Sequence, residues 1–227
     1  MGTKEWDWSK NKSDYWLTPT IEMPYLAERW QQKGFQKILD LGAGLGRHSV
    51  FFAKRGFTVS AFDLSDYGIK HLTDWANREG ISIDTKVGNM LSLPYETESM
   101  DALVAYNVLY HCTTEEFQKA LAECARVLRP GGEIFLTMIS KDSPSYQNAQ
   151  KEQFLDRNTI LRDESDTERN VPHFFVNIED IRPLFHGFIW ELPPAEIFEF
   201  ISSDPHNSTK HWRLLLKKTV DSEFQLG

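Results

Sequence analysis

The sequence predicts an α/β fold in which a mainly parallel sheet lies between two layers of helices, and three features support this prediction. A short apolar run over residues 37–41 breaks directly into a glycine-rich segment. A second apolar run, residues 57–64, places Asp63 at its end. Further apolar runs alternate with a segment of helical periodicity up to residue 139. Strands that alternate with helices are typical of a parallel sheet with both faces covered.

The segment after the first strand, Gly42-Ala-Gly-Leu-Gly46, predicts a tight turn into a helix. Glycine tolerates positive φ and, because it lacks a Cβ, allows a ligand to approach the backbone closely. The helix that follows the turn presents backbone N–H groups toward whatever lies there. Asp63, at the end of the second strand, is placed to accept hydrogen bonds from both hydroxyls of a ribose. Together these features predict a pocket for an adenosine-containing molecule.

The order of the glycines distinguishes two classes of cofactor. Dinucleotide sites use Gly-x-Gly-x-x-Gly, in which the third glycine allows the helix to pack closely on the strand beside a pyrophosphate. Here Arg47 occupies the position of that third glycine, and Asp40 lies two residues before the first one. A carboxylate at Asp40 would repel a pyrophosphate and suits a ligand with a cationic end, such as the ammonium of a methionine moiety. The pattern favours a sulfonium nucleoside, although a glycine triplet alone also fits an ordinary tight turn.

The Asp-x-Gly-x-Gly-x-Gly segment from Asp40 to Gly46 resembles motif I of the class I S-adenosylmethionine-dependent methyltransferases. The Leu-Arg-Pro-Gly-Gly turn at residues 128–132 is also similar to a turn of this family. A Pro-His-Phe-Phe run at residues 172–175 gives a weaker similarity to small bacterial methyltransferases of the tellurite-resistance-like subgroup. The family resemblance implies a Rossmann-like three-layer sandwich with S-adenosyl-L-methionine as its cofactor. It also implies a seven-stranded, mostly parallel sheet with an antiparallel C-terminal strand.

The middle of the chain supplies the next elements in the order that this fold requires. Residues 85–91 predict a short strand that ends in polar residues, and residues 100–111 predict a fourth strand with its active-site exit. Residues 117–128 carry apolar side chains at helical spacing, and residues 133–139 predict a fifth strand. The turn at residues 128–132 is expected to separate that helix from that strand.

The C-terminal third predicts one more helix and two strands. Residues 178–185 read as a short helix with Asn177 as a candidate N-cap. Residues 187–192 and 211–217 read as strands with a long connection. In the family the last strand lies antiparallel beside the fifth, so an antiparallel hairpin is expected at the end. A dinucleotide-binding half-domain would instead continue with parallel βα units.

The resemblance implies a set of cofactor-binding residues in four segments of the chain. The glycine turn and the acid after the second strand hold the methionine and ribose parts, the polar end of the third strand holds the adenine, and the exit of the fourth strand flanks the methionine part. These residues are Asp40, Gly42, Ala43, Gly44, Gly46, Arg47, Asp63, Leu64, Ser65, Gly88, Asn89, Met90, Tyr106 and Asn107. Asn89 departs from the family pattern, in which aspartate is most usual. Its side-chain oxygen can still accept a hydrogen bond from the adenine amino group.

The exit of the fourth strand and the N-terminal aromatic residues are the candidate acceptor side. Tyr110 and His111 leave the carboxyl end of that strand, where open α/β sheets bind ligands. His111 or His173 is a candidate general base, because histidine can take up a proton near neutral pH. Either histidine could equally hold a carbonyl by a hydrogen bond. Tyr15 and Trp16 either form a lid over the cofactor or pack the outer helix. The candidate substrate-pocket residues are Tyr15, Trp16, Tyr110 and Phe174.

We expect a single methyltransferase domain over residues 1–227, organised in four parts. Residues 1–34 form an N-terminal helical arm or lid that is rich in aromatic side chains, and residues 35–140 form the cofactor-binding core. Residues 141–176 form an insertion on the substrate side. Residues 177–227 form the C-terminal helix and β-hairpin.

The composition limits the partners of the protein. A chain of 227 residues with 41% hydrophobic content can bury one sizeable core. The net charge of −8, with no lysine- or arginine-rich tract, disfavours nucleic acid as a partner. The sequence shows no membrane span and no secretory signal, and it has only two cysteines, so we expect a cytoplasmic protein. We therefore expect a small-molecule acceptor, no nucleic acid or membrane partner, no metal, and a monomer or homodimer.

Methyl transfer from a sulfonium is an in-line displacement at carbon, which requires neither a metal nor a covalent nucleophile. The protein must orient donor and acceptor and exclude water, and it needs a base only if the acceptor starts protonated. We therefore predict an S-adenosylmethionine-dependent methyltransferase that acts on a small molecule. Two alternatives stay open: a nicotinamide-dependent oxidoreductase, and a non-catalytic ligand-binding protein on the same fold.

Overall fold

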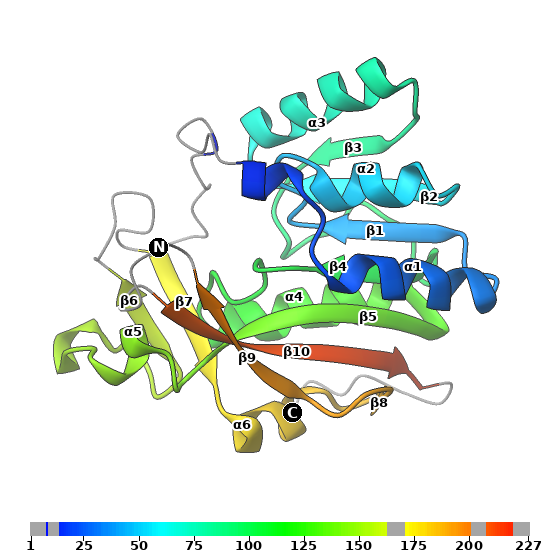
Figure 1. Cartoon of the computed structure of the whole chain (residues 1–227). Coiled ribbons are helices and arrows are strands. Elements are labelled where there is room, and N and C mark those ends of the chain that lie inside the picture. The colour runs from blue at the N-terminus through cyan, green and yellow to red at the C-terminus, as the bar shows by residue number, and fades with distance from the viewer. Residues whose placement is uncertain (1–7, 9–13, 163–170, 201–207, 220–227) are drawn as a thin grey trace.

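The structure, a computed structural model, describes residue 8 and residues 14–162, 171–200 and 208–219. Within these residues one extended sheet is flanked by helices (Figure 1). The strands are β1 (Lys37–Leu41), β2 (Thr58–Asp63), β3 (Asp84–Val87), β4 (Met100–Ala105), β5 (Leu128–Ser140), β6 (Thr159–Arg162), β7 (Val171–Val176), β8 (Phe188–Trp190), β9 (Ala195–Phe200) and β10 (Ser208–Lys218). The helices are η2 (Asp14–Leu17), α1 (Glu22–Gln32), α2 (Arg47–Ala53), α3 (Asp66–Glu79), α4 (Thr114–Val127), α5 (Pro144–Gln147), η3 (Lys151–Gln153) and α6 (Ile178–Leu184). None of these helices combines the length and the apolar character that crossing a bilayer would require.

The main path of the sheet has the strand order β3-β2-β1-β4-β5-β10-β8. The first five strands of this path are parallel neighbours. β10 lies antiparallel between β5 and β8, with His211 opposite Ile139 and Lys217 opposite Glu133. The expected mostly parallel α/β sheet with an antiparallel C-terminal strand beside the fifth strand is therefore confirmed.

Three strands lie outside that path, and the sequence analysis did not anticipate them as strands. β9 pairs antiparallel with β10. β6 and β7 form an antiparallel pair, and β7 also joins the end of β5 in parallel. Figure 1 shows β6, β7 and α5 together beyond that end of β5. All six residues of β7 are buried, and such a continuous apolar run has no alternation by which a strand could be recognised.

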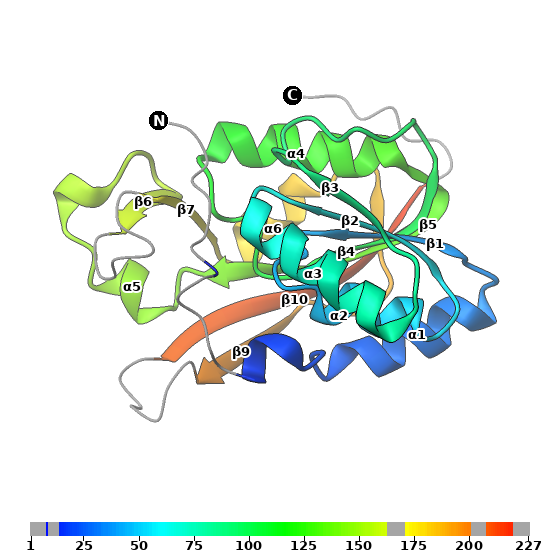
Figure 2. The ribbon, with the colours of Figure 1, turned by 90° about the horizontal axis from the view of Figure 1, so that it is seen from above.

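Two apolar cores occupy the two faces of the sheet and confirm the three-layer arrangement. One core contains Leu39 of β1 and Phe117 of α4. The other contains Ile38 of β1 together with Trp30 of α1 and Phe52 of α2. Ile38 and Leu39 are consecutive in one strand, so their side chains point to opposite faces. Figure 2 shows α4 on one side of the sheet and α1 on the other.

Polar side chains begin several of the helices. At the start of α4, the Thr113 hydroxyl accepts a hydrogen bond from the Glu116 N–H, and the Glu116 carboxylate accepts one from the Thr113 N–H. The expected N-cap Asn177 begins α6 and accepts a hydrogen bond from the Asp180 N–H. These caps satisfy backbone donors that the first turn of a helix leaves unpaired.

The Leu-Arg-Pro-Gly-Gly turn lies inside β5, whereas the sequence analysis expected it before the strand. Leu128 already pairs with Met100, and regular pairing resumes with Glu133 opposite Ala102. The residues between them bulge out of the ladder, and Gly131 there has a φ of 76°. Glycine adopts this conformation without strain, which makes the bulge possible.

A buried carboxylate joins α1 to the sheet. Glu133 on β5 is fully buried, and the indole N–H of Trp30 donates to its Oε2 over 2.9 Å. Arg29 donates two hydrogen bonds to the same carboxylate, over 2.9 and 2.8 Å, and Lys33 also contacts it. Burial opposes ionisation, but the hydrogen bonds from these cations outweigh it and hold the pKa of Glu133 below its ordinary value.

Candidate functional site

The carboxyl ends of β1, β2 and β4 meet at one edge of the sheet, because these strands are parallel neighbours. The predicted cofactor-binding residues leave this edge in successive loops: Gly42 follows β1, Leu64 follows β2 and Tyr106 follows β4. The segment after β3 joins them, since the Gly88 N–H donates to the Asp63 carbonyl oxygen over 2.9 Å. The structure thus brings the four predicted segments to the same edge.

The turn between β1 and α2 requires glycine at its first and last predicted positions. Gly42 and Gly46 have φ values of 73° and 97°. A Cβ on Gly42 would lie 2.5 Å from the Val108 side chain, and one on Gly46 would lie 2.3 Å from the Leu72 side chain. A larger residue at either position would therefore both strain the backbone and collide with its neighbour.

Trp8, from the N-terminal arm, lies against the middle glycine of the turn. A Cβ on Gly44, whose φ is 54°, would come within 2.5 Å of the indole ring. On the other side, a Cβ on Gly68 in the first turn of α3 would lie 2.8 Å from the Gly44 carbonyl oxygen. The two glycines therefore allow the arm, the turn and α3 to approach one another closely. The sequence analysis identified the aromatic character of the arm but gave no signal for this particular contact.

Backbone N–H groups fix the carboxylate of Asp63. The Gly44 N–H donates to Oδ2 and the Ser65 N–H donates to Oδ1, each over 2.8 Å. Ser65 also begins α3, where its hydroxyl accepts from the Gly68 N–H over 3.2 Å. Because each carboxylate oxygen can accept more than one hydrogen bond, the backbone can orient Asp63 while the same oxygens accept from a ligand.

Asp40 is a buried carboxyl group beneath the turn. It is 2% exposed, and the Ser49 hydroxyl donates to its Oδ2 over 2.5 Å. Burial raises the pKa of Asp40 to about 6, because the hydrogen bond from Ser49 only partly offsets it and the charge of Asp63 adds to it. The site therefore holds two carboxyl groups whose negative charges repel each other.

The predicted adenine-side residues follow β3. A Cβ on Gly88 would lie 2.6 Å from the Phe62 ring, so glycine permits this segment to pack on β2. The side-chain oxygen of Asn89 accepts a hydrogen bond from the Leu91 N–H over 3.0 Å. This contact occupies one lone pair of that oxygen and fixes the side chain in a local turn. Met90 is buried beside it.

Asn107 holds an unusual backbone conformation at the exit of β4. Its φ is 54°, a value that residues other than glycine seldom adopt. The Asn107 N–H donates to the Thr137 hydroxyl oxygen over 2.8 Å, and that hydroxyl donates back to the Asn107 side-chain oxygen over 2.7 Å. Thr137 on β5 therefore stabilises a strained residue of the kind that gathers at functional sites.

Arg47 is surrounded by aromatic rings. Its guanidinium carbon lies 5.1 Å from the ring centre of Tyr15, 5.2 Å from that of Trp16 and 5.3 Å from that of Tyr106. Its Nη1 also donates to the Tyr15 carbonyl oxygen over 3.1 Å. The rings attract the cation, and the cluster connects the N-terminal arm to the turn and to the exit of β4. Tyr15 and Trp16 thus lie next to the glycine turn.

Tyr110, His111 and His173 lie together on the predicted acceptor side. The ring centres of Tyr110 and His111 are 4.5 Å apart, and those of His111 and His173 are 4.6 Å apart. His173 is fully buried, with Nδ1 3.0 Å from the Val171 carbonyl oxygen. Because a carbonyl only accepts, this nitrogen carries a proton. The two candidate bases are therefore neighbours, although one sits deep in β7.

Phe174 lies deeper in the protein than the other predicted pocket residues. Its ring is fully buried and stacks on Phe117 of α4, with ring centres 4.6 Å apart. Its backbone N–H donates to the Tyr110 carbonyl oxygen over 2.8 Å. Phe174 is therefore joined to the acceptor side by its backbone, while its side chain packs in the core.

Two residues that the sequence analysis missed complete this side of the site. Glu199 on β9 accepts a hydrogen bond from the Tyr106 hydroxyl over 2.5 Å. Its other oxygen lies 3.1 Å from Nδ1 of His211 on β10, and Nε2 of His211 lies 3.0 Å from the Tyr110 hydroxyl. The missing signal is tertiary, because Glu199 belongs to a strand that the sequence did not predict. Across the described parts of the chain, no three histidine, cysteine or acidic residues are grouped so as to hold a metal ion.

Comparisons with known proteins find methyltransferases among the similar sequences and structures. A family model described as a methyltransferase domain matches residues 38–132. The ubiquinone biosynthesis O-methyltransferase of Coxiella burnetii is 25% identical over 144 residues, which cover 62% of this chain and 60% of that protein. The match to this curated relative thus spans about three fifths of the relative's length.

Solved structures share the fold over most of the chain. An S-adenosylmethionine-dependent methyltransferase from Methanosarcina mazei superposes with a TM-score of 0.72 at 19% identity, and the match covers 90% of this chain and 100% of that one. A second structure is that of the 1,6-didemethyltoxoflavin-N1-methyltransferase of Burkholderia thailandensis, solved with 1,6-didemethyltoxoflavin and S-adenosylhomocysteine. It superposes with a TM-score of 0.59 at 19% identity, and the match covers 88% of this chain and 79% of that one. At these identities the likeness is one of fold.

Proposed function

We propose that this chain, which carries a class I S-adenosylmethionine-dependent methyltransferase domain, transfers a methyl group from S-adenosyl-L-methionine to a small-molecule acceptor. The observation that carries the proposal is the paired carboxyl groups at the glycine turn. Asp63 is oriented there by the Gly44 and Ser65 N–H groups, and Asp40 is buried beneath. Asp63 suits the ribose of a nucleoside, and Asp40 suits a cationic amino-acid part and would repel the pyrophosphate of a dinucleotide.

The cofactor-binding roles follow from these positions. Asp63 would accept hydrogen bonds from the two ribose hydroxyls, because each oxygen of a carboxylate can accept more than one hydrogen bond. Asp40, when ionised, would attract the positive charge of the methionine part. Asn89 and Met90 would hold the adenine, and Asn107 would flank the methionine part from the exit of β4. The remaining predicted cofactor residues lie in the glycine turn, at the start of α2 and in the loops after β2, β3 and β4.

When bound, S-adenosylmethionine supplies a methyl group on an already activated sulfonium, so the reaction is an in-line displacement at carbon. The chain has to position the acceptor against that methyl group, and orientation of this kind can contribute about 7–11 kcal/mol. Water must also be kept away from the reacting atoms. Tyr15, Trp16 and Arg47 lie next to the turn and would provide this cover.

The acceptor is proposed to enter beside Tyr110 and His111. These residues leave the same sheet edge as the cofactor loops, where open α/β sheets place their ligands. We also propose that the protein acts in the cytoplasm, as a monomer or homodimer, and on a partner other than nucleic acid. Two buried free cysteines, Cys112 and Cys124, and the net charge of −8 support this view.

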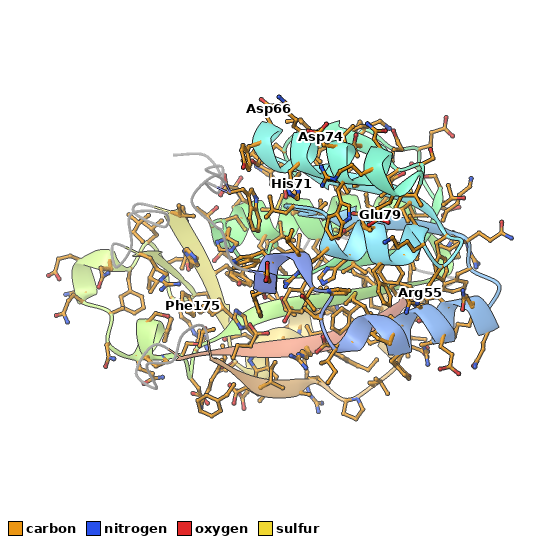
Figure 3. All side chains as sticks on the ribbon, turned by 45° about the horizontal axis from the view of Figure 1, so that its top comes forward. Arg55, Asp66, His71, Asp74, Glu79 and Phe175 are labelled. Atoms are coloured by element: carbon orange, nitrogen blue, oxygen red, sulfur yellow. The ribbon has the colours of Figure 1, made fainter. Side chains whose placement is uncertain are left out.

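Isothermal titration with S-adenosylhomocysteine tests the proposal through Asp63→Asn. The wild type should bind, and the variant should bind roughly 5- to 150-fold more weakly, because the ribose loses an ionised acceptor worth about 1–3 kcal/mol. Asp74→Asn is the matched control, since Asp74 lies on the exposed side of α3 (Figure 3). The control should bind like the wild type. A folded wild type that binds NADH but no S-adenosylhomocysteine would contradict the proposal.

A further inference from the structure

Four polar side chains contact one another in a row along the acceptor side. The Tyr106 hydroxyl donates to Glu199, Glu199 faces His211, and His211 contacts the Tyr110 hydroxyl. Glu199 lies opposite Thr209 and His211 lies opposite Ile197 in the β9–β10 ladder. Glu199 and His211 are therefore diagonal neighbours on the same face of the two strands. The start of β10 lies beside the end of β5, at the edge where the cofactor loops leave the sheet.

The donor and acceptor atoms give this row of side chains a direction for proton transfer. A carboxylate can only accept, so the His211 tautomer that carries its proton on Nδ1 suits the contact with Glu199. In that tautomer Nε2 is an acceptor, and the Tyr110 hydroxyl, 3.0 Å away, would donate to it. The contact between Nδ1 and Glu199 is 3.1 Å but is not ideally angled for a hydrogen bond. Such contacts often tighten when a substrate binds.

The Glu199 carboxylate stays ionised. Burial alone would raise the pKa of Glu199, but the contact with His211 and the hydrogen bond from the Tyr106 hydroxyl hold it below its ordinary value. Arg213 adds to this effect from 3.7 Å. An ionised carboxylate next to a histidine stabilises the imidazolium that forms when the ring gains a proton. A histidine paired in this way can therefore act as a general base.

We propose that Tyr110, His211 and Glu199 form a proton relay that removes the proton of a phenolic hydroxyl acceptor. This inference rests on the proposed function. The acceptor oxygen would form a bond to the methyl carbon while the carbon–sulfur bond breaks and its electron pair stays on sulfur. The acceptor proton would pass to the Tyr110 oxygen as the Tyr110 proton passes to Nε2 of His211. Tyr110 touches the acceptor, whereas His211 and Glu199 act through Tyr110.

The relay suits an acceptor that must lose a proton before it can react, and a phenolic hydroxyl is such an acceptor. The relay ends at the Glu199 carboxylate, which lies 3.1 Å from His211. A thiol acceptor would have less need of a relay, because a thiol loses its proton more readily than a phenol does. The titratable and charged groups that face the relay are Tyr106 and His111 after β4, His173 on β7, Arg213 on β10 and Glu22 on α1.

Two acceptor probes of different acidity test the relay. Catechol stays protonated at neutral pH, whereas the nitro group of 4-nitrocatechol makes its hydroxyl far more acidic. Formation of S-adenosylhomocysteine from S-adenosylmethionine is measured for each probe, with the wild type and with His211→Gln. With catechol, the variant should lose about 100-fold or more in kcat/KM, and its pH–rate profile should differ from that of the wild type. With 4-nitrocatechol the loss should be much smaller, because the probe arrives ionised.

Controls separate this inference from the proposed function. His186→Gln removes an exposed histidine outside the site and should leave both probes unaffected. His211→Gln should still bind S-adenosylhomocysteine as the wild type does. If His211→Gln fails to fold, Tyr110→Phe, which removes only the hydroxyl, is compared with the wild type on the same two probes.

Equal losses with both probes, an unchanged pH profile, or no transfer to either probe by a protein that binds the cofactor would overturn the relay. A wild type that does not bind the cofactor would overturn the proposed function as well.

Discussion

At the scale of single residues, Asp40 shows how a residue proposed to bind the cofactor can lower the stability of the fold. The carboxyl group is almost completely buried and lies near a second acid, Asp63. Its pKa rises from 3.8 to about 6 because burial disfavours the charged form. A neutral side chain of the same shape would avoid this penalty, so the acid is explained by the ligand that it would hold.

Asp40→Asn should therefore stabilise the protein above about pH 6 and weaken cofactor binding. Between about pH 4 and pH 6 the unfolded chain loses the Asp40 proton while the folded chain keeps it, so wild-type stability falls as the pH rises through this window. The difference of about 2 pKa units corresponds to roughly 3 kcal/mol at higher pH. Urea unfolding of the wild type and of Asp40→Asn at pH 4 and pH 8 measures this difference in the free energy of unfolding. An Asp40→Asn variant less stable than the wild type at pH 8 would refute this view of Asp40.

The residues proposed to bind the cofactor could be predicted from the sequence because each depends on a local feature of the backbone. Gly42 and Gly46 are required by the backbone of one turn, and Asp63 stands at the end of one strand. Glu199 and His211 carried no such signal. They meet Tyr110 only because β9 and β10 bring distant parts of the chain to the exit of β4.

At the scale of elements, the attachment of α1 to the sheet depends on the buried carboxylate of Glu133. Glu133→Gln would leave the cations of Arg29 and Lys33 without their fully buried partner, although Glu191 still lies near both. Because Glu191 remains, we expect a loss of about 2 kcal/mol, below the usual range for a broken buried pair. The pKa of Glu133 is lowered, so this stabilisation is present at neutral pH and is lost as the pH falls below the ordinary range of glutamate.

Urea unfolding of Glu133→Gln at pH 7 checks this expectation against Lys119→Gln. Lys119 pairs with Glu115 on the surface of α4, where both side chains are mostly exposed. Loss of such a pair should change stability by only about 0.5 kcal/mol. Equal effects of the two substitutions would show that Glu133 does not fix α1 to the sheet.

The elements that could be predicted are those with a periodic pattern or a cap. α4 follows helical spacing and begins at a capping box, and α6 begins at Asn177 as expected. β9 was missed because residues 195–200 carry acids and aromatics on a strand whose partner, β10, is formed elsewhere in the chain. The turn at residues 128–132 was recognised, but sequence alone did not show that β5 pairs with β4 on both sides of it.

At the scale of the whole molecule, the apolar cores on both faces hold the sheet so that the loops proposed to bind the cofactor leave a single edge. α4 and α6 pack on one face, and α1 and α2 pack on the other. The parallel part of the sheet places the cofactor loops at that edge, and the antiparallel β10 returns His211 to it. Donor and acceptor sides can therefore be built from segments that are far apart in the sequence.

The structure of the protein crystallised with S-adenosylhomocysteine tests the central claim most directly. We predict that the carboxylate of Asp63 lies within hydrogen-bond distance of the ribose hydroxyls, that Asp40 lies on the side of the methionine part, and that Tyr110 faces the sulfur across the acceptor space. A nucleoside bound with both carboxyl groups turned away from it would contradict the account.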